Sequence, residues 1–543
     1  MKKEVWGWAL LAFAVVTLNC VRLGGPILAD DSFQYLSIAE NLAAGNGIRT
    51  SIVHFDTERS HGELPAPMTW FPAGYPAAMA VLSLMGIPRH WAGFGVSSLS
   101  LAALVLVIAW LCSWYRLSAL ATRLVLFLLI ANSWTLLYSG GVLTESVFTA
   151  VSIGAIAVLA AVSEQTGKPG QANRIGLWAL CGLLIGISSW ARYAGVFLYA
   201  SLGLFLAIEV VLGGRRDLRG PIAAVVTATI PLAVLLLRNV LLVGNWRGGN
   251  SIDSSTSVPE LVRDAFVTAY ELFFGELVRA RFGVAEVLVV LSAGVCGIVV
   301  IRTALKHREA IARELAGRPS LLPVLTYVGV YIGALVYLSF FSQLGFSYRY
   351  CYPFLPLLLV LIGLLVAVAA PHMRRSLSGR AAAAAAVALL GCYVFLNVRN
   401  TLQPWSSGSL FADRRVTVYF EAPMPSGGSL RSWMEANVPA DRAIAAANGQ
   451  ATAYVLRRKT VSMIAHDNSA YTWEEREVRE VMTRFRADFL ILYPQAPSRA
   501  APQVQNESKF LGALAQGRKT AKWLLLAAEN PFVKVFRRKA ASR

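Results

Sequence analysis

Long stretches of uncharged, apolar residues recur along this chain and stop near residue 398. Hydrophobic residues make up 56% of the 543 residues, and charged residues only 15%, against roughly 25% in soluble domains. A helix needs about 20 apolar residues to cross a bilayer. The chain is therefore predicted to be a polytopic α-helical membrane protein that ends in a water-exposed part.

Eleven of these stretches are predicted as membrane spans, and the first is expected to be retained as a helix rather than cleaved. They cover about residues 5–24, 91–113, 120–138, 144–163, 175–190, 193–212, 221–243, 284–302, 320–342, 351–370 and 380–398. With the N-terminus in the cytoplasm, every short cytoplasmic loop carries Arg or Lys, in agreement with the positive-inside rule. The formal net charge of +19 is explained by these loops and does not indicate a nucleic-acid partner.

An odd number of spans places the end of the chain on the outer face. We expect a transmembrane domain over residues 1–398, with long outer loops at 25–90 and 244–283, and a periplasmic domain over 399–543. The second loop is expected to include an interfacial helix. Arg outnumbers Lys, with 10 Lys among the 50 basic residues, which is typical of a GC-rich bacterial genome and predicts the bacterial inner membrane.

The C-terminal part alternates strand-like and helical patterns. Buried strands are predicted at Ala443–Asn448, Thr460–Ala465 and Asp488–Pro494, with a closing strand at Phe532–Phe536. Apolar residues recur at helical spacing from Val478 to Phe485. These patterns predict a small α/β domain with a mainly parallel sheet, and it contains no glycine-rich nucleotide-binding motif.

Two adjacent acids, Asp30 and Asp31, follow the first span. One of them, most plausibly Asp31, can cap a helix that begins near Ser32. Two neighbouring carboxylates at a membrane boundary are costly, however, unless a substrate or a cation uses them. Glu145 is expected at the same membrane level, where its structural alternative is a place in the first helical turn after Thr144.

Three arginines, Arg192, Arg238 and Arg349, lie at the outer ends of spans, against the charge bias of the other loops. A planar guanidinium can bind phosphate through two hydrogen bonds. For Arg238 the alternative is that its side chain extends to the membrane surface. Arg349 is flanked by Tyr348 and Tyr350, which favours a role at a lipid headgroup.

The first outer loop holds further candidates. The block Trp70–Pro76, which includes Tyr75, predicts a bent entry to a helix, and a purely structural turn is the alternative. His54 and His61 precede this block, and His466 follows a C-terminal strand. Their spacing does not make a metal site, so solvated loop residues are the simpler interpretation.

In this order, the motifs resemble the GT-C superfamily of membrane glycosyltransferases, and in particular the branch with protein O-mannosyltransferases and the bacterial aminoarabinose-to-lipid A transferase. The matching residues are Asp30–Asp31, Phe71–Pro76, Thr144–Glu145, Arg192–Tyr193, and Arg349–Tyr350 followed by Pro353 and Pro356. The resemblance implies a sugar donor linked to a polyprenyl phosphate and used at the outer face.

The resemblance also implies roles for the acids. The first-loop acid acts on the acceptor hydroxyl, which carries over to Asp30, or to Asp31 if the register differs by one. Glu145 takes the place of the second acidic motif. The family often has Asp-Glu where this chain has Asp-Asp, so the identity of the base and the use of a divalent metal stay open.

The chemistry fits these residues independently. Transfer from a lipid phosphate needs a base for the incoming hydroxyl and positive charge on the departing phosphate. Asp30 can supply the first, and Arg349 with Tyr350, Arg192 or Arg238 the second; Trp70, Tyr75 and His54 are candidates for contacts to substrate.

A single displacement with no enzyme nucleophile predicts an inverting glycosyltransferase without a tightly bound cofactor. Its acceptor would be a glycan, a lipid or a protein, and membrane lipids surround it. The alternative function is a transporter or lipid flippase, although no internal repeat supports it.

Overall fold

A computed structural model describes most of the chain. The described residues are 2–54, 60–164, 174–211, 217–246, 248, 256–276, 284–341, 346–373, 377–402, 411–463, 471–494 and 508–539. Nine helical segments among them are long and apolar enough to cross a membrane, and a bent pair of helices makes a tenth. The prediction of a multi-pass helical membrane protein is therefore confirmed.

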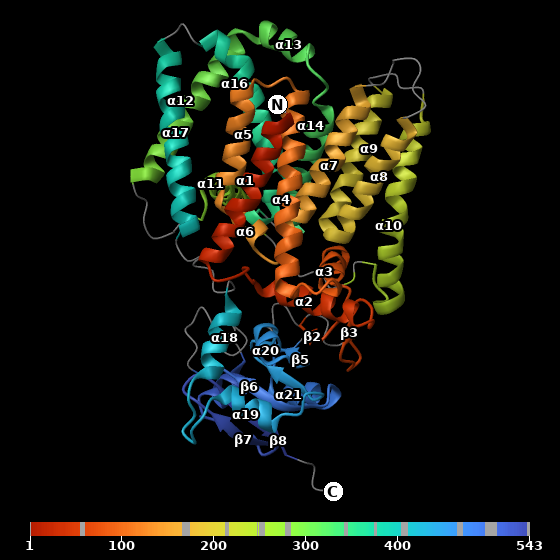
Figure 1. Ribbon diagram of the computed structural model, residues 1–543, viewed down its shortest axis with the longest axis vertical. Helices are drawn as coiled ribbons and strands as arrows, with labels where there is room; N and C mark the ends of the chain where they lie inside the picture. Colours follow the sequence, from red (N-terminus) through yellow and green to blue (C-terminus); the bar gives the residue numbers. More distant parts are fainter. Residues whose placement is uncertain are drawn as a thin grey trace.

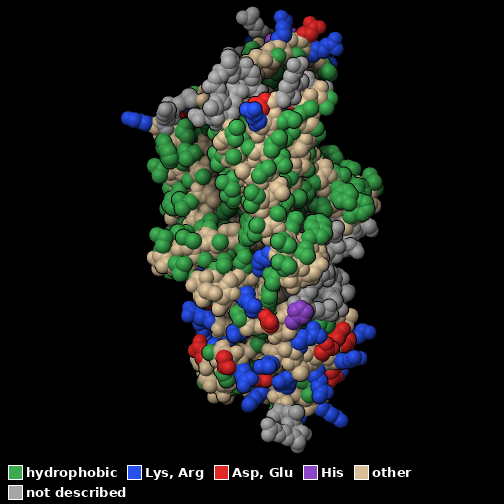
Figure 2. Space-filling view, turned by 90° about the vertical axis from the view of Figure 1, so that its right-hand side faces the viewer, with side chains coloured by type: hydrophobic (Ala, Val, Ile, Leu, Met, Phe, Trp, Pro, Cys, Tyr) green, Lys and Arg blue, Asp and Glu red, His purple; other side chains and the backbone are tan. Residues whose placement is uncertain are grey.

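The long helices form a bundle (Figure 1), and apolar side chains cover most of the face of the bundle that Figure 2 shows. The long helices are α1 (Lys2–Arg22), α4 (Arg89–Trp114), α7 (Glu145–Glu164), α9 (Val196–Val211), α10 (Arg219–Val243), α12 (Val284–Lys306), α14 (Leu322–Phe341), α16 (Leu355–Met373) and α17 (Leu377–Leu402). The fifth predicted span is α8 (Arg174–Ala191), which packs against α7 and α10.

The third predicted span is a bent pair of helices rather than one continuous helix. It consists of α5 (Ala119–Ala131) and α6 (Ser133–Gly140), which meet at an angle of 58°. Asn132 at the break accepts hydrogen bonds from the backbone N–H groups of Trp134 and Thr135, at 3.0 and 3.1 Å. The side chain of Asn132 thus provides a hydrogen-bond acceptor for backbone N–H groups that have no helical partner at the bend.

Loops at one end of the bundle hold the N-terminal region. Arg123 forms an ion pair with Glu4 at 2.6 Å, and Arg318 donates a hydrogen bond to the carbonyl of Tyr115 at 2.6 Å. The short helix α13 (Arg308–Ala316) lies at this same end (Figure 1). The two loops that contain Arg116 and Arg318, which are predicted to share a side with the N-terminus, therefore lie together.

The opposite end carries α2 (Asp30–Ala43), the two-stranded sheet of β1 (Arg49–Thr50) and β3 (Ala66–Pro67), and α3 (Gly74–Leu84). Gly74 allows α3 to pack against the end of α8, because a Cβ atom there would lie 2.6 Å from the carbonyl oxygen of Trp190. In the second outer loop, α11 (Val258–Phe274) packs against α17, so the expected helix is present.

The C-terminal region forms a mixed sheet beside α2 (Figure 1). Its strand order is β2-β5-β4-β6-β8-β7, with β2, β5, β4 and β6 parallel and β8 antiparallel to both β6 and β7. The strands are β2 (Ile52–Val53), β4 (Ala443–Ala446), β5 (Thr460–Ser462), β6 (Ala487–Leu492), β7 (Leu524–Glu529) and β8 (Lys534–Arg538). The helices of this region are α18 (Ala412–Glu421), α19 (Leu430–Asn437), α20 (Gly449–Leu456), α21 (Glu475–Arg484) and α23 (Lys509–Ala515).

One strand of this sheet comes from the first outer loop. Ile52 and Val53 pair with Thr460 and Val461 of β5, and residues of α2 and of the C-terminal region share one hydrophobic core. The loop that carries the acid pair is therefore fixed between the bundle and the sheet. His466 and Asp467 lie outside the described residues.

Candidate functional site

Asp30 and Asp31 occupy the first turn of α2. The helix begins at Asp30, and the hydroxyl of Ser32 accepts a hydrogen bond from the backbone N–H of Ala29, at 2.9 Å. Neither acid caps the helix, so the capping alternative for Asp31 is wrong. Consecutive residues of a helix point about 100° apart, and the two carboxylates therefore face different surroundings.

Asp31 belongs to a cluster of opposite charges. Its carboxylate forms an ion pair with Nη2 of Arg349. Nε of Arg349 and Nη1 of Arg192 each lie 2.5 Å from Oε1 of Glu145. The Glu145 side chain is fully buried, and a buried carboxylate requires such partners because isolated charge is costly away from water.

Three distant segments bring these side chains together. Glu145 is the first residue of α7, Arg192 follows α8, and Arg349 lies in the short helix α15 (Tyr348–Cys351) that precedes α16. Nη1 of Arg192 also donates to the hydroxyl of Thr144 at 3.3 Å. The ends of several spans on the α2 side of the bundle thus converge on the start of α2.

Aromatic rings enclose the cluster. The hydroxyl of Tyr35 lies 3.4 Å from that of Thr144, and the guanidinium of Arg192 lies 5.9 Å from the ring centre of Tyr350. Tyr35 was not identified from the sequence, although its position four residues after Asp31 on one helix is a usable signal.

The cluster is closed on one side and open on the other. The side chains of Asp31 and Arg349 are 21% and 32% exposed, whereas that of Glu145 is 0% exposed. Within the described part of the chain, no hydrogen bond is made by Nη1 of Arg349. This donor, on a partly exposed guanidinium, is the one best placed to bind an anionic ligand.

Asp30 lies beside the cluster without joining it. Burial raises the pKa of its carboxyl group to about 7, and the negative charge of Asp31 raises it further in the same direction, against the opposing effect of Arg415 and Arg349. Among the described residues it has no hydrogen-bond partner. A carboxyl group that titrates near neutral pH is suited to accept a proton from a substrate.

The structure does not bring Arg238 to the cluster. Its Nη1 and Nη2 donate to the backbone carbonyls of Met68 and Ile48, at 2.8 and 3.0 Å. This guanidinium holds the first outer loop against α10, which differs from the predicted contact with phosphate.

His54 and Tyr75 also lie elsewhere. His54 Nδ1 is 2.8 Å from the hydroxyl of Ser462 and its Nε2 is 3.1 Å from Nε2 of Gln450, so it joins the loop to the C-terminal sheet. Burial lowers the pKa of His54 to about 3. Tyr75 is buried, donates to the carbonyl of Gly93 at 3.0 Å and packs edge-on against Tyr35.

Trp70 is half-buried beside the β1–β3 sheet, where it lines a small cavity with Met68 and Val243. It precedes Phe71, whose ring packs edge-on against Tyr35 at 5.2 Å between ring centres. The Trp70–Pro76 block is thus linked to the charged cluster through Tyr35, which contacts both Phe71 and Thr144. In the described residues, no group of three or more His, Cys, Asp or Glu side chains is arranged to hold a metal ion.

Comparison with known proteins identifies the fold. No protein-family model and no curated protein sequence matches this chain. Among solved structures, ArnT from Cupriavidus metallidurans bound to undecaprenyl phosphate is similar, with a TM-score of 0.55 at 14% identity over 98% of both chains. The same protein in the apo state gives a TM-score of 0.54 at 14% identity, over 98% of this chain and 97% of that chain.

A second similar structure is the oligosaccharyltransferase of Archaeoglobus fulgidus in complex with Zn and sulfate. Its TM-score is 0.52 at 13% identity, over 94% of this chain and 71% of that chain. These likenesses confirm that the chain has the GT-C fold, with its helical bundle and small C-terminal sheet region.

Proposed function

We propose that this protein is a glycosyltransferase that moves a sugar from a polyprenyl-phosphate donor to a hydroxyl acceptor at the outer face of the membrane. The observation that carries the proposal is the convergence of Asp31, Glu145, Arg192 and Arg349 next to Asp30. A carboxyl group suited to accept a proton would thus lie beside a cationic group suited to bind a phosphate. The likeness in fold to a protein solved with undecaprenyl phosphate supports a lipid-linked donor.

In this proposal Asp30 accepts the proton of the acceptor hydroxyl. The hydroxyl oxygen attacks the anomeric carbon, and the bond from that carbon to the phosphate oxygen breaks. Its electron pair leaves with the polyprenyl phosphate, whose additional negative charge is stabilised by Arg349. A single displacement inverts the anomeric configuration, so recovery of a retained configuration would exclude this mechanism.

The remaining members of the cluster have positioning roles. Glu145 holds Arg192 and Arg349 together, because its Oε1 contacts both guanidinium groups. Asp31 fixes Arg349 from the side of α2, and Tyr350 lies beside Arg192. Because these contacts hold the two guanidinium groups in place before the reaction, the groups need little rearrangement when negative charge develops on the phosphate.

The proposed location is the bacterial inner membrane, with the N-terminus in the cytoplasm. Two observations support this orientation: the basic loops lie at the N-terminal end of the bundle, and α2 lies at the other end with the C-terminal sheet. The periplasmic domain would comprise residues 399–543, completed by β2 from the first outer loop.

Reconstitution into liposomes tests the proposal. The protein is supplied with a labelled polyprenyl-phosphate sugar and an envelope extract, and the wild type is compared with Asp30→Asn and Asp31→Asn. We expect transfer by the wild type, nearly complete loss in Asp30→Asn and partial loss in Asp31→Asn. Transfer that is unaffected by both changes would exclude the acid pair. Label that crosses the bilayer without transfer would favour a transporter or flippase.

A further inference from the structure

A second polar site lies on the outer part of the molecule, away from the cluster of Glu145. It is a cavity of about 200 Å³ between α2, the first residue of α4 and the turn from α20 to β5. Its lining includes Ser37 and Glu40 of α2, Arg89 of α4, and Arg457 and Lys459 of the turn. Two regions distant in sequence, the first outer loop and the C-terminal region, therefore form its walls.

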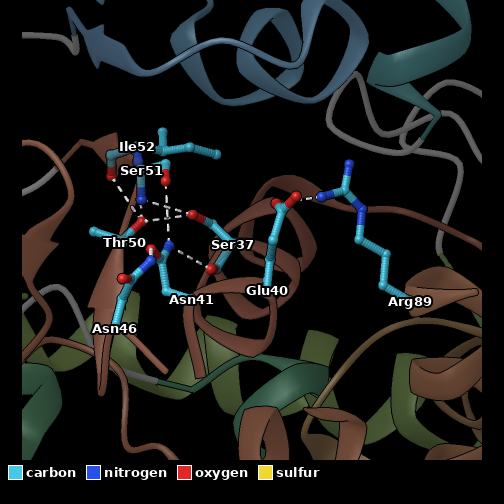
Figure 3. Close-up of polar contacts among 8 residues, drawn as sticks. All are labelled: Ser37, Glu40, Asn41, Asn46, Thr50, Ser51, Ile52 and Arg89. Carbon is cyan, nitrogen blue, oxygen red and sulfur yellow. Dashed lines mark hydrogen bonds and ion pairs between the residues drawn. The ribbon is translucent and has the colours of Figure 1, made fainter. Parts of the chain in front are cut away.

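Positive charge exceeds negative charge in this cavity. Four basic residues line it, Arg89, Arg457, Arg458 and Lys459, against the one carboxylate of Glu40. Glu40 is already paired with Arg89 (Figure 3). In the described part of the chain, neither Arg457 nor Lys459 forms an ion pair.

A hydroxyl group beside α2 can donate a hydrogen bond into the cavity. The Ser37 hydroxyl accepts from the backbone N–H of Ser51 at 2.7 Å and lies 3.2 Å from the hydroxyl of Thr50. The Ser51 hydroxyl accepts from Nδ2 of Asn41 at 3.1 Å. Because the Ser51 oxygen acts as an acceptor in this network (Figure 3), the proton of its hydroxyl is available to a ligand.

The cavity lies on the same face of α2 as Asp30. Residues Asp30, Phe33, Ser37 and Glu40 follow one another at spacings of three or four, which places them along one side of a helix. A rise of about 1.5 Å per residue puts Ser37 and Glu40 at about 10 and 15 Å from Asp30 along the axis. Asp31 points to the other side, toward Arg349.

We propose that this cavity binds an anionic group, a phosphate or a carboxylate, that is carried by the acceptor. The inference rests on the proposed function, since it assigns the two faces of α2 to the two substrates. The donor phosphate lies on the Asp31 side with Arg349, and the acceptor lies on the Asp30 side. Its anionic group would be separated by about 10–15 Å from the hydroxyl that is glycosylated.

Anion binding by the full chain tests this proposal without relying on sugar transfer. The protein is placed in nanodiscs of phosphatidylcholine and titrated with inorganic phosphate at constant ionic strength, with heat as the readout. The informative variant is Arg457→Gly with Lys459→Gln, which removes two charges. Glycine suits position 457, because Arg457 ends α20 at φ +52°.

We expect this double variant to bind phosphate at least fivefold more weakly than the wild type. The matched control, Arg476→Gln with Arg479→Gln on α21, removes the same charge elsewhere in the C-terminal region and should change the affinity less than twofold. Arg349→Gln removes the proposed donor-phosphate site and should retain the phosphate binding at the cavity. An unchanged affinity in the first variant, or complete loss in Arg349→Gln, would overturn the proposal.

Acetate, titrated in the same way, distinguishes the two anions: tighter binding of acetate than of phosphate supports a carboxylate-bearing acceptor, and the reverse order supports a phosphate-bearing one. Failure of the proposed function would appear separately, as sugar transfer that does not depend on Asp30.

Discussion

Asp30 predicts the pH dependence of the reaction. With a pKa of about 7, only about one tenth of the carboxyl groups are ionised at pH 6, and about nine tenths at pH 8. A base must be ionised to accept the acceptor's proton, so activity should rise roughly tenfold between these values. The assay is the initial rate of sugar transfer in proteoliposomes at subsaturating acceptor, measured from pH 5 to 9.

Two variants complete this prediction. Asp30→Asn should lower the rate by about 10²- to 10⁴-fold, the usual contribution of a general base, and should remove the rise near pH 7. Asp31→Asn should move the midpoint to lower pH, because the negative charge of Asp31 contributes to the raised pKa of Asp30. A midpoint that stays near pH 7 in Asp30→Asn would refute the assignment.

Protein stability gives an independent readout of the same group. The pKa of Asp30 is about 7 in the folded state and about 3.9 in an unfolded chain. Between these values the folded state holds a proton that the unfolded chain has released, so stability decreases as pH rises toward 7. Asp30→Asn should therefore have a higher Tm than the wild type at pH 8, and the difference should close toward pH 4. Equal Tm values at pH 8 would contradict a raised pKa.

Three further variants separate catalytic from structural roles. Glu145→Gln removes the negative charge that Arg192 and Arg349 share and should cost about 3–5 kcal/mol of stability or of transition-state binding. The loss would be measured as a lower Tm or a lower kcat. If both Tm and kcat were unchanged, the positioning role of Glu145 would be contradicted. Arg238→Ala should lower Tm by loosening the first outer loop while leaving the KM for the donor unchanged, and a raised KM alone would favour phosphate binding. His54→Gln should leave the pH–rate midpoint unchanged, because the pKa of His54 is about 3; a shifted midpoint would contradict this.

The sequence predicts the bundle well because each membrane span is a local property. About 20 apolar residues identify a helix without knowledge of its neighbours. The bend at Asn132 is the exception: mean hydropathy does not register one polar residue in an apolar stretch. Asn132 followed by Ser133 is nevertheless a usable N-cap signal.

The members of the charged cluster were identified as candidates, but their pairing was not. Asp31 and Arg349 are separated by 318 positions in the sequence, and a single sequence contains no direct record of such a contact. The role of Arg238 was missed for a similar reason, since its partners are backbone carbonyls, which have no signature in the sequence. Strand β2 was missed because two residues are too few for an alternating pattern.

The central claim is that the departure of a lipid phosphate is coupled to the attack of an acceptor hydroxyl. The most direct measurement counts polyprenyl phosphate released and sugar transferred in the same proteoliposomes, from a donor labelled in both parts. Equal amounts of the two products are expected in the wild type, and neither product above background in Asp30→Asn. Sugar-linked lipid that reaches the other leaflet intact, with no phosphate released, would contradict it.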